Sequence, residues 1–169
     1  MQSTIKLYTY GYSEVKTYLM ASLFVIGNLI LPQCFHLFPQ GGMVWLPIYF
    51  FTLVGAYKYG WKVGLLTAVF SPLANAYLFG MPTLTVLPAI LTKSVLLAVG
   101  AGYAARRFQT VSIGLLAEVV LFYQMVGTLA EWAYTGSLEM ALQDFRIGVP
   151  GMLSQVFVGY WVVKYLIRK

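Results

Sequence analysis

Long runs of apolar residues dominate the sequence, and short stretches with turn residues separate them. A hydrocarbon core about 30 Å thick requires roughly 20 residues of helix, and fewer where neighbouring helices bury a segment. The runs are continuous rather than alternating, which favours helices over the strands of a barrel. The pattern therefore predicts an all-α membrane protein, a six-transmembrane-helix bundle with spans at residues 17–31, 43–57, 61–79, 84–103, 111–132 and 148–167.

The composition agrees with this pattern. Of the 169 residues, 60% are hydrophobic and only 9% are charged, and the mean hydropathy is +0.76. Such a chain has too little polar surface to cover a water-soluble globule. No polar stretch is long enough to fold separately, so we expect residues 1–169 to form a single integral membrane domain. Segment 1–16 lacks the features of a signal peptide, and we expect the first span to be retained.

Basic residues collect on one side of this topology. With six spans both termini lie on the same side, and that side carries Lys6, Lys16, Lys58, Lys62, Arg106, Arg107, Lys164, Arg168 and Lys169. The positive-inside rule then predicts that both termini are cytoplasmic. The opposite side carries Glu131, Glu139 and Asp144, with Arg146. The net charge of +6 follows from this topology and from anionic lipid headgroups, so it requires no nucleic-acid partner.

Polar side chains inside the predicted spans share one level. Counted from the non-cytoplasmic ends of their spans, Lys93 lies at a depth of roughly 13 Å, Gln124 at roughly 12 Å and Gln155 at roughly 10 Å. Asn75 lies in the same half, and Glu118 lies deeper, at roughly 20 Å. We therefore expect a polar, outward-facing site that binds a small solute supplied from outside.

Each of these residues also has a purely structural interpretation. Asn28, in the same half of the bundle, and Gln155 could bond across helices at about 0.6 kcal/mol each. A charge near the bilayer centre costs about 2.5 kcal/mol or more, so Lys93 requires a partner. That partner is either Glu118, in a buried ion pair, or an anionic group of a ligand. An unpaired ammonium would favour a carboxylated solute.

The remaining candidates carry weaker signals. Trp132 and Tyr77 are either interfacial anchors or walls of a pocket mouth. His36, after the first span, is expected to make a loop or lid contact rather than bind a metal. The sequence contains no HExxH, GxSxG or Walker A motif and only one cysteine, Cys34. We therefore expect no enzyme activity, no metal site and no cofactor bound by this chain.

One stretch, residues 57–107, contains a series of short motifs. They are Gly60 with Gly64, Ser71-Pro72, Gly80-Met81-Pro82, Leu87-Pro88 and Arg106-Arg107. Together they resemble the middle of a substrate-binding S component of an energy-coupling factor (ECF) vitamin transporter. The length, the helix count and the predicted topology are similar to this family along the whole chain.

The resemblance implies a multi-pass protein of a prokaryotic cell (inner) membrane that captures a vitamin-like nutrient from outside. It also implies docking onto a transmembrane T component with two ATPase subunits, which would hydrolyse the ATP. Docking in the family uses small residues on the first span, here Ala21, Ser22 and Gly27, although Val25 stands where the common Ala-x-x-x-Ala pattern has its second alanine. Two alternatives stay open: a stand-alone secondary carrier or channel with a Lys93–Glu118 relay, and a membrane accessory subunit that transports nothing.

Overall fold

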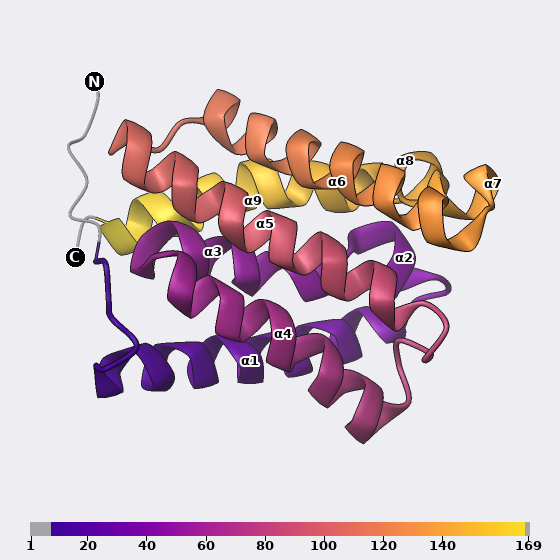
Figure 1. Ribbon diagram of the computed structural model, residues 1–169, viewed down its shortest axis with the longest axis horizontal. Coiled ribbons are helices and arrows are strands. Elements are labelled where there is room, and N and C mark those ends of the chain that lie inside the picture. Colours follow the sequence, from indigo (N-terminus) through magenta and orange to yellow (C-terminus); the bar gives the residue numbers. More distant parts are fainter. Residues whose placement is uncertain (1–7, 168–169) are drawn as a thin grey trace.

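The computed structural model describes residues 8–167, and this part of the chain is helical without any β-strand (Figure 1). Four of its helices are long and apolar enough to cross a membrane: α1 (Val15–His36), α4 (Trp61–Phe79), α5 (Leu87–Phe108) and α6 (Ile113–Thr135). The other elements are α2 (Gly41–Trp45), η1 (Pro47–Tyr49), α3 (Phe50–Tyr59), α7 (Leu138–Ala141), α8 (Gln143–Ile147) and α9 (Val149–Ile167). The prediction of an all-helical fold is confirmed for the described residues, and four of the helices could span a membrane.

The second predicted span, residues 43–57, is broken into α2, η1 and α3. Leu46, between α2 and η1, has a left-handed backbone with φ of 46°. Pro47 follows it and has no N–H with which to continue a helix. The expectation of one unbroken helix here is therefore wrong, and the Leu46-Pro47 pair explains the break.

The other predicted spans coincide with helices and differ mainly at their ends. The span 61–79 has the predicted bounds because Gly60 and Gly80, with φ of 96° and 67°, adopt conformations that other residues rarely adopt. Helix α1 continues past the predicted end, and Pro32 lies inside it. Helix α5 begins later than predicted, with Pro88 in its first turn, where proline is best tolerated.

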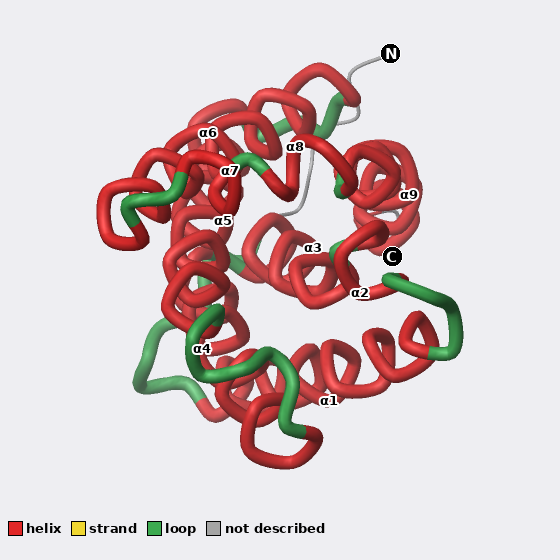
Figure 2. The backbone as a smooth tube through the Cα atoms, turned by 90° about the vertical axis from the view of Figure 1, so that its right-hand side faces the viewer, coloured by secondary structure: helices red, strands yellow, loops and turns green. Residues whose placement is uncertain are grey.

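The short helix α3 lies in the middle of the bundle, with α1, α4, α5 and α9 against it (Figure 2). Its Leu53, Ala56 and Tyr57 side chains are fully buried. Helix α4 approaches closely because Gly64 has no side chain: a Cβ there would lie 2.8 Å from the Cα of Ala56. Leu46 and Tyr49 at the break in the segment α2–η1–α3 are also buried, so other parts of the protein cover its non-helical backbone.

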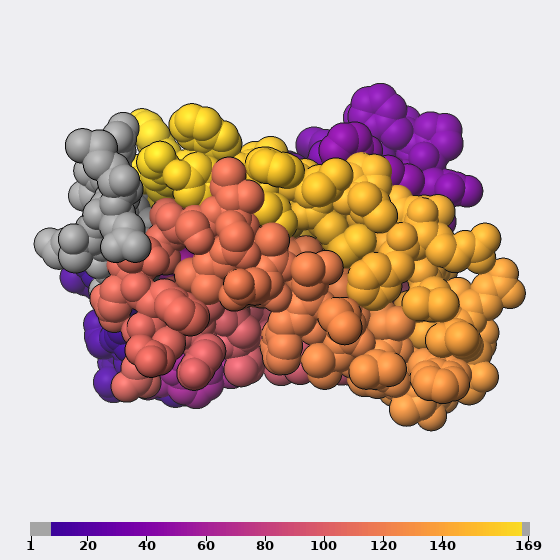
Figure 3. Space-filling view, turned by 90° about the horizontal axis from the view of Figure 1, so that it is seen from above, coloured from indigo at the N-terminus to yellow at the C-terminus, as the bar shows by residue number. Residues whose placement is uncertain are grey.

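The two ends of the bundle differ in charge. The start of α1 and the end of α9 lie at the same end (Figure 1), and basic residues on the adjoining helix ends are Lys16, Lys58, Lys62, Arg106, Arg107 and Lys164. The opposite end, which we call the α8 end, contains α2, α7 and α8. There the segment that joins α6 to α9 packs beside the segment that follows α1 (Figure 3).

Candidate functional site

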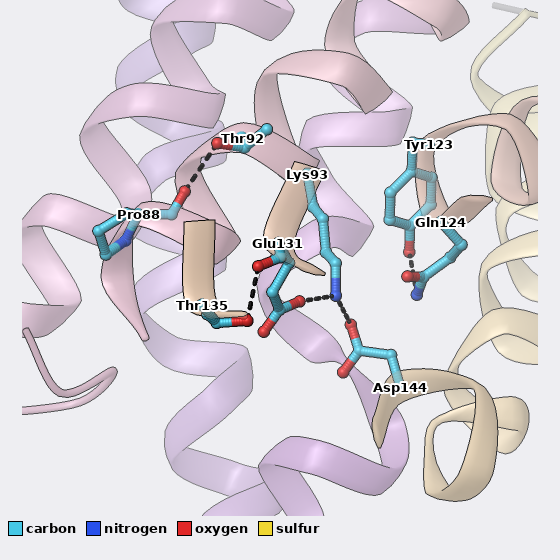
Figure 4. Close-up of polar contacts among 8 residues, drawn as sticks. All are labelled: Pro88, Thr92, Lys93, Tyr123, Gln124, Glu131, Thr135 and Asp144. Atoms are coloured by element: carbon cyan, nitrogen blue, oxygen red, sulfur yellow. Dashed lines mark hydrogen bonds and ion pairs between the residues drawn. The ribbon is translucent and has the colours of Figure 1, made fainter. Parts of the chain in front are cut away.

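Lys93 on α5 is buried between two carboxylates (Figure 4). Its Nζ lies 2.7 Å from Glu131 Oε2 on α6 and 2.7 Å from Asp144 Oδ2 on α8. The Lys93 side chain is 3% exposed, whereas Glu131 is 11% and Asp144 20% exposed. Three separate elements therefore supply one ion-pair network at the α8 end of the bundle.

The aliphatic part of Lys93 lies against a glycine. A Cβ on Gly127 of α6 would collide with Cγ of Lys93 and would lie 3.4 Å from Cδ and Cε. Gly127 is one turn before Glu131 on the same helix, so the glycine admits the lysine stem while the acid binds its ammonium. The local sequence of α6 thus positions the charge on α5.

A stripe of polar residues continues along α6 from the ion pairs. Gln124, Thr128 and Glu131 recur at helical spacing and are all buried. The Tyr123 hydroxyl donates to Gln155 Oε1 on α9 at 2.9 Å and accepts from Gln124 Nε2 at 3.2 Å. We call Lys93, Glu131, Asp144, Thr128, Gln124 and Gln155 the Lys93 site.

This region also contains buried polar atoms that have no partner. In the part of the chain that the structure describes, four buried side-chain atoms lack a hydrogen bond: Ser94 Oγ, Gln124 Oε1, Thr128 Oγ1 and Gln155 Nε2. Three belong to residues of the Lys93 site, and the fourth belongs to the residue after Lys93. Native proteins satisfy nearly all buried polar groups, so these atoms require further partners, which water or a polar solute can supply.

A surface depression lies beside this site at the α8 end. Its volume is about 390 Å³, and its lining residues are Gln40, Met43, Glu139, Met140, Gln143, Arg146 and Ile147. Gln143 Nε2 also contacts Met43 Sδ at 3.0 Å, which ties α8 to α2. Because Gln143 lines the depression while the next residue, Asp144, binds Lys93, α8 separates the depression from the buried ion pairs.

The structure assembles only part of the predicted site. Lys93, Gln124 and Gln155 lie together as expected, but Asn75 belongs to another cluster. Asn75 Nδ2 donates to the backbone oxygens of Asn28 and Ser71, at 2.9 Å and 3.0 Å. Asn75 therefore links α4 to α1 and lies in a different cluster from Lys93, and its predicted role in solute binding stays a prediction.

Asn28 is the centre of that other cluster. Its Nδ2 donates to Thr52 Oγ1 and Ser71 Oγ, both at 3.2 Å, and its Oδ1 accepts from the backbone N–H of Phe51 at 3.2 Å. We call Asn28, Thr52, Ser71 and Asn75 the Asn28 cluster. It joins α1, α3 and α4, which agrees with the structural interpretation of Asn28.

The expected pairing of Lys93 with Glu118 is wrong. Glu118 is exposed on α6 near the start of that helix, whereas Lys93 binds Glu131 and Asp144 near the other end of the bundle. From the sequence, Glu131 and Asp144 are expected only on the non-cytoplasmic side of the topology, not beside Lys93. A sequence signal for Glu131 exists, since it follows Gly127 and Thr128 on the stripe that begins at Gln124.

The predicted pocket walls do not reach the Lys93 site. The Tyr77 side chain is 89% exposed and that of Trp132 is 45% exposed, so both point away from the bundle interior. Outward-facing aromatic rings at helix ends are typical of interfacial anchors. His36 is also exposed, and its ring lies beside Gly42 of α2 rather than near Lys93.

The small residues predicted for docking do not form one exposed face. Ala21 is buried in the core, and Gly27 faces the ring of Phe51 on α3. Only Ser22 of the three is exposed. Ala21 and Gly27 of α1 make contacts within their own bundle, and their contact with a partner stays a prediction.

The described residues contain no group of three or more His, Cys, Asp or Glu side chains that could hold a metal ion. Comparison of the chain with models of protein families, with curated proteins and with solved structures gave no match. A functional assignment therefore depends on the geometry of the Lys93 site.

Proposed function

We propose that the chain is the substrate-binding subunit of an ATP-driven uptake system for a small, polar, vitamin-like nutrient. The observation that carries this proposal is the Lys93 site itself: a buried ammonium between two carboxylates, with unpartnered buried polar atoms on α5, α6 and α9. Intramembrane charges are costly and generally serve ligand or ion pathways. The solute binds at this site from the depression at the α8 end.

The proposed topology has six spans with both termini in the cytoplasm of a prokaryotic cell. The broken segment α2–η1–α3 serves as the second span and α9 as the sixth. Support for this count comes from the common end reached by the start of α1 and the end of α9 (Figure 1). Support for the orientation comes from the basic residues at that end and the acidic residues at the α8 end.

The proposed energy source is a partner. The sequence has no nucleotide-binding motif, so a transmembrane T component with two ATPase subunits would drive uptake, as the resemblance to S components implies. The exposed side of α1 is the part of the chain that we assign to lipid or to this partner. It carries Val15, Leu19, Ser22, Leu23, Ile26 and Ile30.

An unpaired Lys93 would favour an anionic solute. Because two carboxylates already bind this ammonium, the reason for that preference is weakened, and a carboxylated solute forms no part of the proposal. The same network gives the alternative of a stand-alone carrier a specific basis. Lys93, Glu131 and Asp144 would then relay protons, in place of the Lys93–Glu118 relay.

Mass spectrometry of the purified chain tests the proposal. After denaturation, the chain should release a small polar molecule, and cells should take up that molecule only when the T component and both ATPases are present. Transport by proteoliposomes that contain this chain alone would instead support the stand-alone carrier. A chain that releases no small molecule and mediates no uptake would support the accessory subunit.

A further inference from the structure

We infer that the solute carries a positive charge, in the form of an ammonium or a protonated ring nitrogen. This inference rests on the proposed function and names the chemical class of its solute. One ammonium and two carboxylates give the ion-pair network a net charge of −1. A buried excess charge is unfavourable unless an opposite charge balances it, and a cationic solute supplies that charge.

Each carboxylate keeps one oxygen that does not bind Lys93. Glu131 and Asp144 each use one oxygen on Lys93, and the second oxygen of each points away from the ammonium (Figure 4). Both carboxylates are more exposed than the lysine, at 11% and 20% against 3%. A cation bound to these second oxygens would leave the bonds to Lys93 intact.

An anionic solute would have no free ammonium to bind at this site. To contact Lys93 it would have to displace Asp144 or Glu131, and the displaced carboxylate would then lie beside a second negative charge. Like charges in contact at a desolvated site are strongly unfavourable, so the arrangement discriminates against carboxylates and phosphates.

The remaining polar atoms describe the rest of the solute. Gln124 Oε1 accepts a hydrogen bond, Gln155 Nε2 donates one, and the hydroxyl of Thr128 can do either. A solute that satisfies them carries hydrogen-bond donors and acceptors next to its cationic nitrogen. The class is therefore a small amine or protonated heterocycle with further polar groups.

Matched probes of equal size test the charge preference. Binding of benzylammonium, benzyl alcohol and benzoate to the purified full chain is measured by competition with the molecule that copurifies, or by thermal shift where none is present. We expect benzylammonium to bind at least about tenfold more tightly than benzoate. Asp144→Asn and Glu131→Gln should each abolish this preference, because either change makes the network neutral.

Glu118→Gln is the matched control, since it makes the same change on the same helix at an exposed position and should keep the preference. Equal binding of the two ions, tighter binding of benzoate, or a preference that survives Asp144→Asn would overturn the inference. A chain that releases an anionic nutrient and prefers benzoate would lose this inference and keep the proposed function. A chain that binds none of the probes and releases nothing would lose both.

Discussion

The Lys93 site and the Asn28 cluster are both buried and polar, yet they differ in how completely their atoms are bonded. Asn28 bridges three helices through neutral hydrogen bonds, and no residue of its cluster is among the described side chains that contain a buried atom without a partner. The Lys93 site contains a charge network with a net charge and three such atoms. Two buried polar clusters of one bundle therefore differ in how many of their atoms are bonded.

This difference separates helix association from solute binding. A fully bonded cluster fixes the arrangement of helices and leaves nothing for a guest. An incompletely bonded cluster is less favourable for folding and becomes favourable when a complementary molecule binds. Polar residues within spans are therefore better sorted by their unpaired atoms than by their depth alone.

The largest expected effect comes from removing the cation of the Lys93 site. Lys93→Met leaves Glu131 and Asp144 buried as two neighbouring negative charges. Loss of one partner from a buried ion pair costs about 3–5 kcal/mol, and we expect the free energy of unfolding to fall by that amount. Equilibrium unfolding in mixed detergent micelles measures this change.

Neutralising the acids provides the control for that prediction. Lys93→Met combined with Glu131→Gln and Asp144→Asn removes all three charges, and we expect most of the lost stability to return. The triple variant should still fail to bind the solute. If Lys93→Met is as stable as the original chain, Lys93 does not form buried ion pairs with Glu131 and Asp144 in the membrane.

A change in the Asn28 cluster should lower stability without changing solute affinity. Asn28→Leu removes three hydrogen bonds that link α1 to α3 and α4. At about 0.6 kcal/mol each, their loss destabilises the bundle by about 2 kcal/mol. Solute affinity, measured at a temperature where the variant is folded, should not change. A loss of affinity without a loss of stability would place Asn28 in the solute site and remove the distinction between the two regions.

A smaller effect is expected where Lys93 crosses α6. Gly127→Ala places a methyl group against Cγ of Lys93, and overpacking of this kind typically costs about 1–3 kcal/mol. The better helix propensity of alanine returns up to about 1 kcal/mol, so the net loss is about 1 kcal/mol. Thermal unfolding measures the loss, and a binding titration should show weaker solute affinity because the ammonium moves.

Gly114→Ala is the matched control for this change. It lies on the same helix, and a Cβ there would meet no atom within 4 Å. Only the gain in helix propensity remains, so this variant should be as stable as the original chain or slightly more stable. Equal behaviour of the two glycine variants would show that Lys93 does not depend on Gly127.

The sequence predicts well where the helices lie along the chain, but it predicts poorly which side of each helix faces the bundle interior. Continuous apolar runs and the glycines at 60 and 80 defined the span 61–79, because these signals are local. Pairing Lys93 with Glu118 used depth alone and ignored the angle around the helix axis. At 3.6 residues per turn, Glu118 and Glu131 point about 140° apart on α6, so only one of them can face Lys93.

Asp144 could not be assigned from local sequence either. It lies in the short segment between α6 and α9, and its contact with Lys93 joins residues 51 positions apart. Only the fold of that segment against α5 and α6 brings it there. Apolar periodicity carries no information about such long-range contacts, whereas it carries much about where a helix runs.

The smallest expected effect concerns a second ion pair at the α8 end. Arg146 Nη1 lies 3.2 Å from Glu139 Oε1, close to Asp144 in sequence, but the two side chains are 65% and 83% exposed. Water screens exposed pairs, so Glu139→Gln should change the free energy of unfolding by less than about 0.5 kcal/mol. Equilibrium unfolding of Glu139→Gln and of Asp144→Asn measures this difference. The two variants compare an exposed acid with a largely buried one in the same segment between α6 and α9. If both variants lost the same free energy of unfolding, the burial of Asp144 would not explain its contribution to stability. The loss would then come from disturbing the segment that contains both acids.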